Sequence, residues 1–90
     1  MASFSSTQTT VTATPALVLT SDTDGCRVVF HVDTGGSHTL YLGGETVSST
    51  TGFALHGGLA VEVALPPNTK VYACTEAGTE TLFCMIVGNN

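Results

Sequence analysis

The chain has 90 residues, of which 42% are hydrophobic and only 10% are charged, and its formal net charge is −5. A chain of this length holds one domain, and a soluble domain usually carries about 25% charged residues. Because its only basic residues are Arg27 and Lys70, the chain lacks the cationic patch that binding to nucleic acid or to an anionic membrane requires.

Residues 1–10 are rich in Ser, Thr and Gln, and we expect them to form a flexible arm with Phe4 as its apolar anchor. They carry neither the basic nor the apolar part of a signal peptide. No apolar run of the sequence is long enough to span a bilayer. We therefore expect synthesis in a cytoplasm. Residues 11–90 are expected to form a single β-sandwich domain.

Turn sequences recur about every ten residues from Val11 onward, which is typical of a sandwich or a barrel. No stretch shows the periodicity of a helix. The sequence therefore predicts an all-β fold, a small antiparallel β-sandwich or jelly-roll-like barrel of about eight short strands with no significant helix. The predicted strands are approximately residues 9–13, 16–20, 26–32, 39–42, 46–49, 59–65, 71–75 and 81–87.

The predicted strands at 26–32 and 39–42 are expected to pair as a hairpin. A loop at 33–37 places Phe30 opposite Leu40, so that apolar side chains share one face, whereas a tighter turn would mix the two faces. The strand at 59–65 alternates, with its apolar residues predicted to face the core and Glu62 to face outward.

The last predicted strand, 81–87, is apolar on both faces. A strand of a two-layer sandwich normally has one face in the core and one toward water. We therefore predict that a neighbouring copy, a host surface or the N-terminal arm covers the second face, with each buried side chain contributing about 1.5–3 kcal/mol. The alternative is a closed barrel that tolerates these outer residues.

The candidate interface residues are Phe4, Leu82, Phe83, Met85 and Val87. Two faces of the last strand remain open as the interface. One carries Phe83, Met85 and Val87, and the other carries Leu82, Cys84 and Ile86.

The chain has three cysteines, Cys26, Cys74 and Cys84, and an odd number disfavours a closed set of disulfides. Their spacing matches no zinc site. A hairpin turn near 77–78 would put Cys74 and Cys84 on opposite faces, where they could not be bridged. We interpret all three as small buried residues in a reducing compartment.

The sequence offers no recognisable catalytic or cofactor site. The predicted register separates His31 from His38, which argues against a metal, and His38 and His56 are expected in surface loops. Asp22 and Asp24 fit an Asp-rich turn better than a calcium loop. Neither a G-x-S-x-G elbow nor a phosphate-binding loop is present. We therefore predict a protein that is not an enzyme and needs no cofactor or metal.

Four stretches in order resemble the pattern of small virion proteins of tailed bacteriophages: 40–44 (LYLGG), 50–55 (TTGFAL), 57–63 (GGLAVEV) and 71–73 (VYA). The similarity extends over roughly residues 26–87, and the three cysteines are not part of the pattern. Proteins of this family are compact β-sandwiches that decorate capsids or form modules of capsid fibres and tails.

The resemblance implies a capsid decoration (cement) protein on the surface of the virion. Its expected partners are the major capsid protein and further copies of itself, as a homotrimer. In this interpretation the N-terminal arm orders on docking to the shell. The alternative is a tail or capsid-surface module that binds a glycan or protein receptor of the host.

Overall fold

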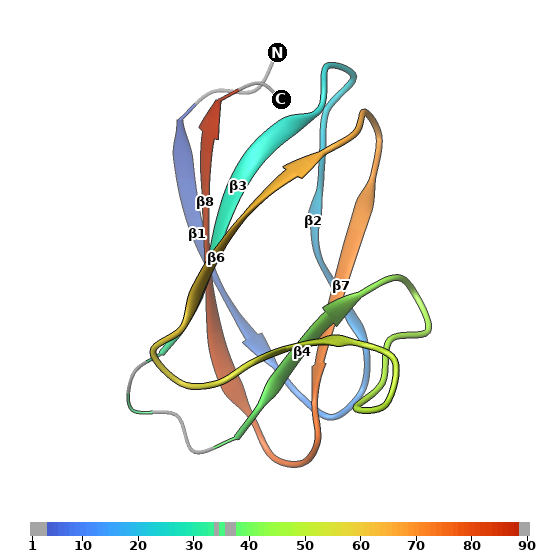
Figure 1. The fold of residues 1–90 in the computed structure, drawn as a ribbon, viewed down its shortest axis with the longest axis vertical. Helices are drawn as coiled ribbons and strands as arrows, with labels where there is room; N and C mark the ends of the chain where they lie inside the picture. Colours follow the sequence, from blue (N-terminus) through green and yellow to red (C-terminus); the bar gives the residue numbers. More distant parts are fainter. Residues whose placement is uncertain (1–3, 34, 36–37, 89–90) are drawn as a thin grey trace.

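Eight β-strands form two four-stranded antiparallel sheets in a computed structural model that describes residues 4–33, 35 and 38–88 (Figure 1). Sheet A has the order β1 (Ser5–Val11), β8 (Glu80–Gly88), β3 (Cys26–Val32) and β6 (Ala60–Leu65). Sheet B has the order β2 (Ala16–Thr20), β7 (Lys70–Thr75), β4 (Leu40–Gly43) and β5 (Phe53–Leu55). The described residues contain no helix, and none therefore that could cross a membrane. The predicted all-β sandwich is confirmed.

The core lies between the two sheets, where each strand places alternate apolar side chains. β3 shows the pattern most clearly, because every second residue from Cys26 to Val32 is buried and the residues between them are more exposed. The largest fully buried side chains are Phe30, Leu40, Leu82, Val11, Val28 and Val32. These residues come from strands of both sheets, so the core depends on the two layers packing face to face.

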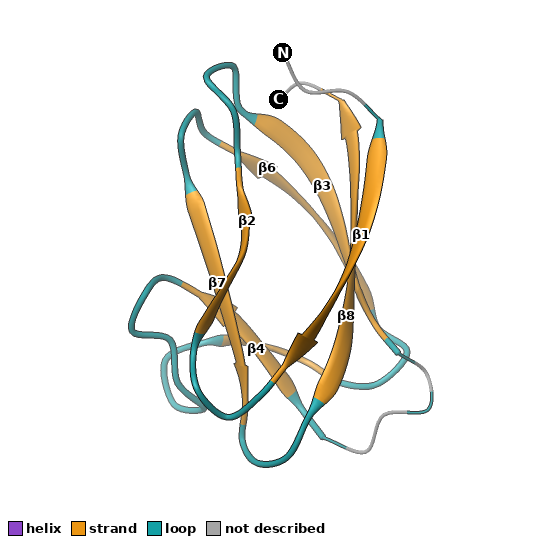
Figure 2. Cartoon of the chain, turned by 180° about the vertical axis from the view of Figure 1, so that it is seen from behind, coloured by secondary structure: helices purple, strands orange, loops and turns teal. Residues whose placement is uncertain are grey.

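One side of the sandwich is closed by the chain itself. β1 continues directly into β2 through residues 12–15, so the chain passes from sheet A to sheet B there, as Figure 2 shows. The Thr75 N–H donates a hydrogen bond to the Thr12 carbonyl oxygen over 2.9 Å, which ties this connection to β7. Val11, at the end of β1, is fully buried.

The expected N-terminal arm is a strand over most of its length. Residues 5–10 belong to β1 and pair with β8 from Ser5 opposite Ile86 to Val11 opposite Glu80. The prediction of a flexible arm over 1–10 was therefore wrong for this part, because a Thr-rich segment satisfies its backbone groups well along the edge of an apolar strand. Residues 1–3 lie outside the described residues.

The predicted hairpin of β3 and β4 does not form. β3 pairs with β6 and β8, while β4 pairs with β5 and β7, so the connection between them crosses from one sheet to the other. The same holds for the predicted hairpin of β7 and β8. Phe30 and Leu40 nevertheless both face the core, as expected. Alternation determines the face of a residue but not the partner of its strand.

The strand predicted at 46–49 is absent, and β5 (Phe53–Leu55) takes its place beside β4. Residues 48–52 instead form hydrogen-bonded turns, with the Gly52 N–H donating to the Ser48 carbonyl oxygen over 2.9 Å. Ser and Thr side chains compete for such local hydrogen bonds and thereby favour turns over strands.

Candidate binding surface

β8 lies in the middle of sheet A, paired with β1 on one side and with β3 on the other. Leu82 and Cys84 point into the core and are 0% and 2% exposed. Phe83 and Met85 alternate with them, point away from the core and remain partly exposed. The face with Leu82 therefore belongs to the core, and the face with Phe83 is the one available to a partner.

The outer face of sheet A carries two rows of side chains that run from β1 across β8 to β3. The register places them as Gln8, Phe83 and His31 in one row and Ser6, Met85 and Val29 in the other. Together they line a shallow hollow of about 450 Å³. The rings of His31 and Phe83 lie 5.6 Å apart, at a tilt of 32°. Neither row includes a charged carboxylate, lysine or arginine side chain.

The other candidate interface residues lie apart from these rows. Val87 lies where the pairing of β3 with β8 shifts register, between Arg27 and Val28. Phe4 is 74% exposed and directly precedes β1. The structure thus brings Phe83 and Met85 together. It adds Val29 and His31, which could be recognised from the sequence only if the pairing of β3 with β8 were known.

The outer face of sheet B differs, because the chain covers the part of it above β4 and β7. Residues 44–52 fold over this face and bury Val47 to 5% exposure. Cys74 points outward from β7 beneath this segment, and its Sγ donates to the Val47 carbonyl oxygen over 3.6 Å. A Cβ atom on Gly52 would lie 2.7 Å from Val47 Cγ2 and 2.6 Å from Tyr41 Cβ. This covering segment, 44–52, leaves no space above sheet B here.

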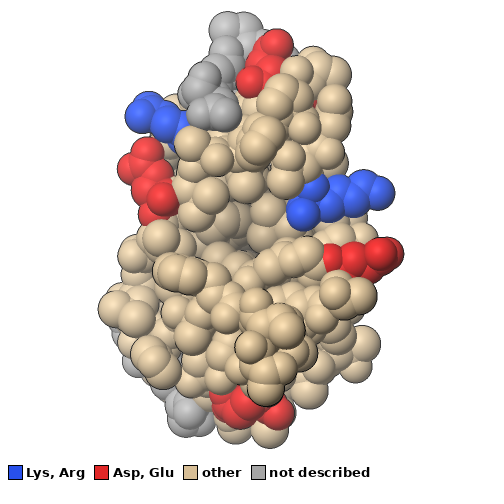
Figure 3. Space-filling model, turned by 45° about the vertical axis from the view of Figure 1, so that its right-hand side comes forward, with Lys and Arg blue, Asp and Glu red and all other residues tan. Residues whose placement is uncertain are grey.

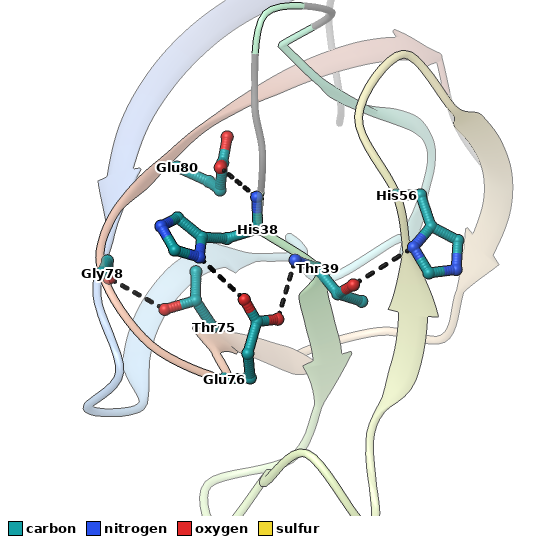
Figure 4. A network of polar contacts seen from close by, with 7 residues as sticks. All are labelled: His38, Thr39, His56, Thr75, Glu76, Gly78 and Glu80. Carbon is teal, nitrogen blue, oxygen red and sulfur yellow. Dashed lines mark hydrogen bonds and ion pairs between the residues drawn. The ribbon is translucent and has the colours of Figure 1, made fainter.

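A polar cluster joins the connection between β3 and β4 to the end of β7 (Figure 4). Glu76 accepts the Thr39 N–H over 2.7 Å and contacts His38 Nδ1 over 2.9 Å. The His38 N–H donates to the Glu80 carboxylate over 2.8 Å. Partial desolvation alone raises the pKa of Glu76, but the bonds from Thr39 and His38 outweigh it and hold this pKa below its ordinary value.

Hydrogen bonding in this cluster anchors the loop that carries His38 and Thr39 to the end of β7. The His38 ring lies against Gly78, where an added Cβ would be 2.5 Å from Nε2. Thr39 Oγ1 and His56 Nδ1 lie 3.1 Å apart, so a hydroxyl meets an imidazole at the margin of the cluster. No three His, Cys, Asp or Glu side chains of the described residues are grouped so as to hold a metal ion. Sequence reasoning missed Glu76 and Glu80 because only the crossing of the chain between sheets brings them to His38.

All three cysteines are buried and free. Burial raises the pKa of the Cys84 thiol to about 11. Burial also raises the pKa of Cys74, and burial together with the nearby Asp22 carboxylate raises that of Cys26. Since the thiolate is the reactive form, these groups are poor nucleophiles at neutral pH.

Comparison with known protein families, curated proteins and solved structures finds no match to this chain.

Proposed function

We propose that this protein is a non-enzymatic structural protein of a tailed-bacteriophage particle, a decoration protein that docks on the major capsid protein through the outer face of sheet A. The observation that carries the proposal is the apolar pair Phe83 and Met85, in the middle of a sheet whose outer face the described chain leaves uncovered. The resemblance of residues 26–87 to small virion proteins supports the choice of partner.

The composition of this face suits a protein interface. Aromatic residues and Met are enriched at such interfaces, and the best-packed centre of an interface contributes most of the binding free energy. Phe83 and Met85 lie on a strand paired on both sides, so their positions are fixed before binding. A preordered surface loses less conformational entropy when it docks.

Docking of this kind stabilises an assembled shell by mass action. A protein that binds the finished shell, and not the separated subunits, shifts the equilibrium toward the shell by an amount that grows with its free concentration. The outer face of sheet A would contact the shell, and sheet B, with its covering segment, would face solvent.

The test uses heads that lack this chain, mixed with purified protein and analysed by co-sedimentation and by the temperature at which they release DNA. We expect the protein to co-sediment with heads and to raise that temperature. Phe83→Ser and Met85→Ser should weaken co-sedimentation at least about tenfold, since each removes a central apolar contact.

Leu17→Ser is the matched control, because Leu17 is 48% exposed and lies on β2 of sheet B. This variant should bind heads as well as the original chain. Loss of binding in Leu17→Ser but not in Phe83→Ser would overturn the assigned surface. Attachment to host cells without binding to heads would overturn decoration and favour the receptor-binding alternative.

A further inference from the structure

β6 (Ala60–Leu65) is an edge strand with a single charged residue, Glu62, and with neither a bulge nor a proline to interrupt it. Among the described strands it pairs with β3 alone. Of the other edge strands, β2 is interrupted by a register shift between Leu17 and Leu19, and β5 has only three residues. β1 is also a regular edge, but its side chains are mostly those of Ser, Thr and Gln. β6 has six residues in regular register, with no proline. Such an edge is a template for pairing with another strand.

The backbone groups that β6 leaves free follow from the ladder it forms with β3. The Val32 N–H donates to the Leu59 carbonyl oxygen over 3.1 Å, in line with the register that pairs Phe30 with Val61. In an antiparallel ladder every second residue bonds to the partner strand. Val61 and Val63 therefore bond toward β3, and the N–H and C=O groups of the alternating residues, Ala60, Glu62 and Ala64, point out of the sheet edge.

An apolar groove of about 580 Å³ opens beneath this same edge. Its walls include Val61, Val63 and Leu65 of β6, with Leu42 and Phe53 of sheet B opposite. Phe53 is 59% exposed, and both valines are only partly buried. Figure 3 shows a hollow in the middle of this side of the molecule, surrounded by uncharged surface with charged residues at its margins. Here the two sheets do not cover each other.

We propose that β6 pairs in antiparallel fashion with β6 of a second copy of this chain, about a two-fold axis that passes beside Val63. The two four-stranded A sheets then become one continuous sheet. Ala64 and Glu62, which carry the free backbone groups, exchange hydrogen bonds with Glu62 and Ala64 of the second copy. On the inner face, Val63 lies opposite Val63 of the second copy and Val61 opposite its Leu65, so apolar side chains meet apolar side chains.

The charges of Glu62 and Arg27 favour the register with the two-fold axis beside Val63 over the register with the axis beside Glu62. A two-fold axis beside Glu62 would place the two glutamates directly opposite each other, which is destabilising. With the axis beside Val63, Glu62 of the second copy lies next to Ala64, whose cross-strand neighbour on β3 is Arg27. Arg27 Nη1 already lies 3.7 Å from Glu62 Oε2 of its own chain, with both side chains about half exposed. Each arginine would then lie within reach of a carboxylate from either copy.

The pairing also accounts for the exposure of the apolar groove beneath β6 in a single copy. The two grooves face each other across the axis, so each copy covers the exposed apolar edge of the other. The outer faces of the A sheets stay on the same side of the joined sheet, and their Phe83 residues remain accessible. The inference therefore does not depend on what that face binds. A two-fold axis gives a dimer, in place of the trimer that the resemblance implies.

The test is sedimentation velocity of the full chain over a range of concentrations, with variants that act on the edge. The original chain should sediment as a dimer that dissociates on dilution. Ala64→Pro should raise the dissociation constant at least about tenfold, because proline removes an outward N–H and leaves the ladder with β3 intact. Ala64→Thr keeps that N–H and should remain a dimer.

Charge variants give a second, independent measurement. Glu62→Lys should weaken the dimer, since it places two cations beside Arg27, and Arg27→Glu combined with Glu62→Lys should restore it. Arg27 and Glu62 are both exposed, so their variants should stay folded. They therefore test the pairing even if circular dichroism shows that Ala64→Pro is unfolded. A monomer at all concentrations, a trimer, or a dimer indifferent to all of these changes would overturn the proposal.

Discussion

Two central strands, β7 in sheet B and β8 in sheet A, carry apolar or weakly polar side chains on both faces beyond their first residues, Lys70 and Glu80. Within the described residues, the outer face of β7 is covered by the chain, and the outer face of β8 is not. Above β7, the covering segment 44–52 buries Cys74 to 2% exposure. Above β8, Phe83 and Met85 are left partly exposed over a shallow hollow. A small domain gains stability by covering apolar surface wherever it has chain to do so. An uncovered face in such a domain therefore stands out as a candidate for contact with another molecule.

Disturbing the packing of the covering segment 44–52 on sheet B should produce the largest loss in the free energy of unfolding. Gly52→Ala places a Cβ 2.6 Å from Tyr41 Cβ and 3.0 Å from the Ser48 carbonyl oxygen, so the segment must shift. We expect the free energy of unfolding to fall by about 1–3 kcal/mol, as is usual for overpacking. Gly44→Ala is the control, because a Cβ there meets nothing within 4 Å. Equal losses in denaturant titrations of the two variants would contradict the tight packing of the cover.

The same substitution on the two outer faces compares them directly. Val47→Ala removes two methyl groups from a side chain that is 5% exposed, and should cost about 1.5 kcal/mol at roughly 0.8 kcal/mol for each buried carbon. Val29→Ala removes the same atoms from the partly exposed face of sheet A and should cost less than about 1 kcal/mol. Chemical denaturation of both variants measures the difference. A larger loss for Val29→Ala would mean that the outer face of sheet A is not an open surface.

The rate of thiol labelling should also distinguish the covering segment from the core between the sheets, with a smaller expected effect than the substitutions above. Cys74 is shielded by the covering segment alone, whereas Cys26 and Cys84 lie in the core between the sheets. Local opening of a surface segment requires less free energy than separation of the sheets. We expect slow labelling by a thiol reagent at neutral pH, with Cys74 modified first and Gly52→Ala accelerating it. Mass mapping that finds Cys84 modified first would reverse this order.

The smallest expected effect is the loss of folding stability in acid that comes from Glu76 in the polar cluster with His38 and Thr39. The folded-state pKa of Glu76 lies below its ordinary value of 4.5, so its stabilising contribution is complete above that value and is lost as the pH falls through the lowered pKa. Glu76→Gln should remove this part of the pH dependence. Thermal unfolding of both proteins from about pH 6 to about pH 3 measures it. Parallel curves over this range would show that Glu76 contributes nothing.

Particular residues show how far sequence reasoning extends into the fold. The bounds of β2 (Ala16–Thr20) and β3 (Cys26–Val32) agree with the prediction, because turn residues and alternation are local signals. The strand expected at 46–49 is absent, since Ser48 hydrogen-bonds through its hydroxyl to Thr50 and Thr51 within a turn. Of the candidate interface residues, Phe83 and Met85 face outward, whereas Leu82 is fully buried in the core.

The sequence by itself determined that this is an all-β fold of short strands, which residues alternate toward its core, and that its last strand has apolar side chains on both faces. Only the tertiary structure decided which strands are neighbours. Alternation repeats every two residues in every strand and so cannot distinguish one partner from another. The packing of two sheets and the crossings between them placed Val29 beside Met85, His38 beside Glu76, and β6 at an open edge.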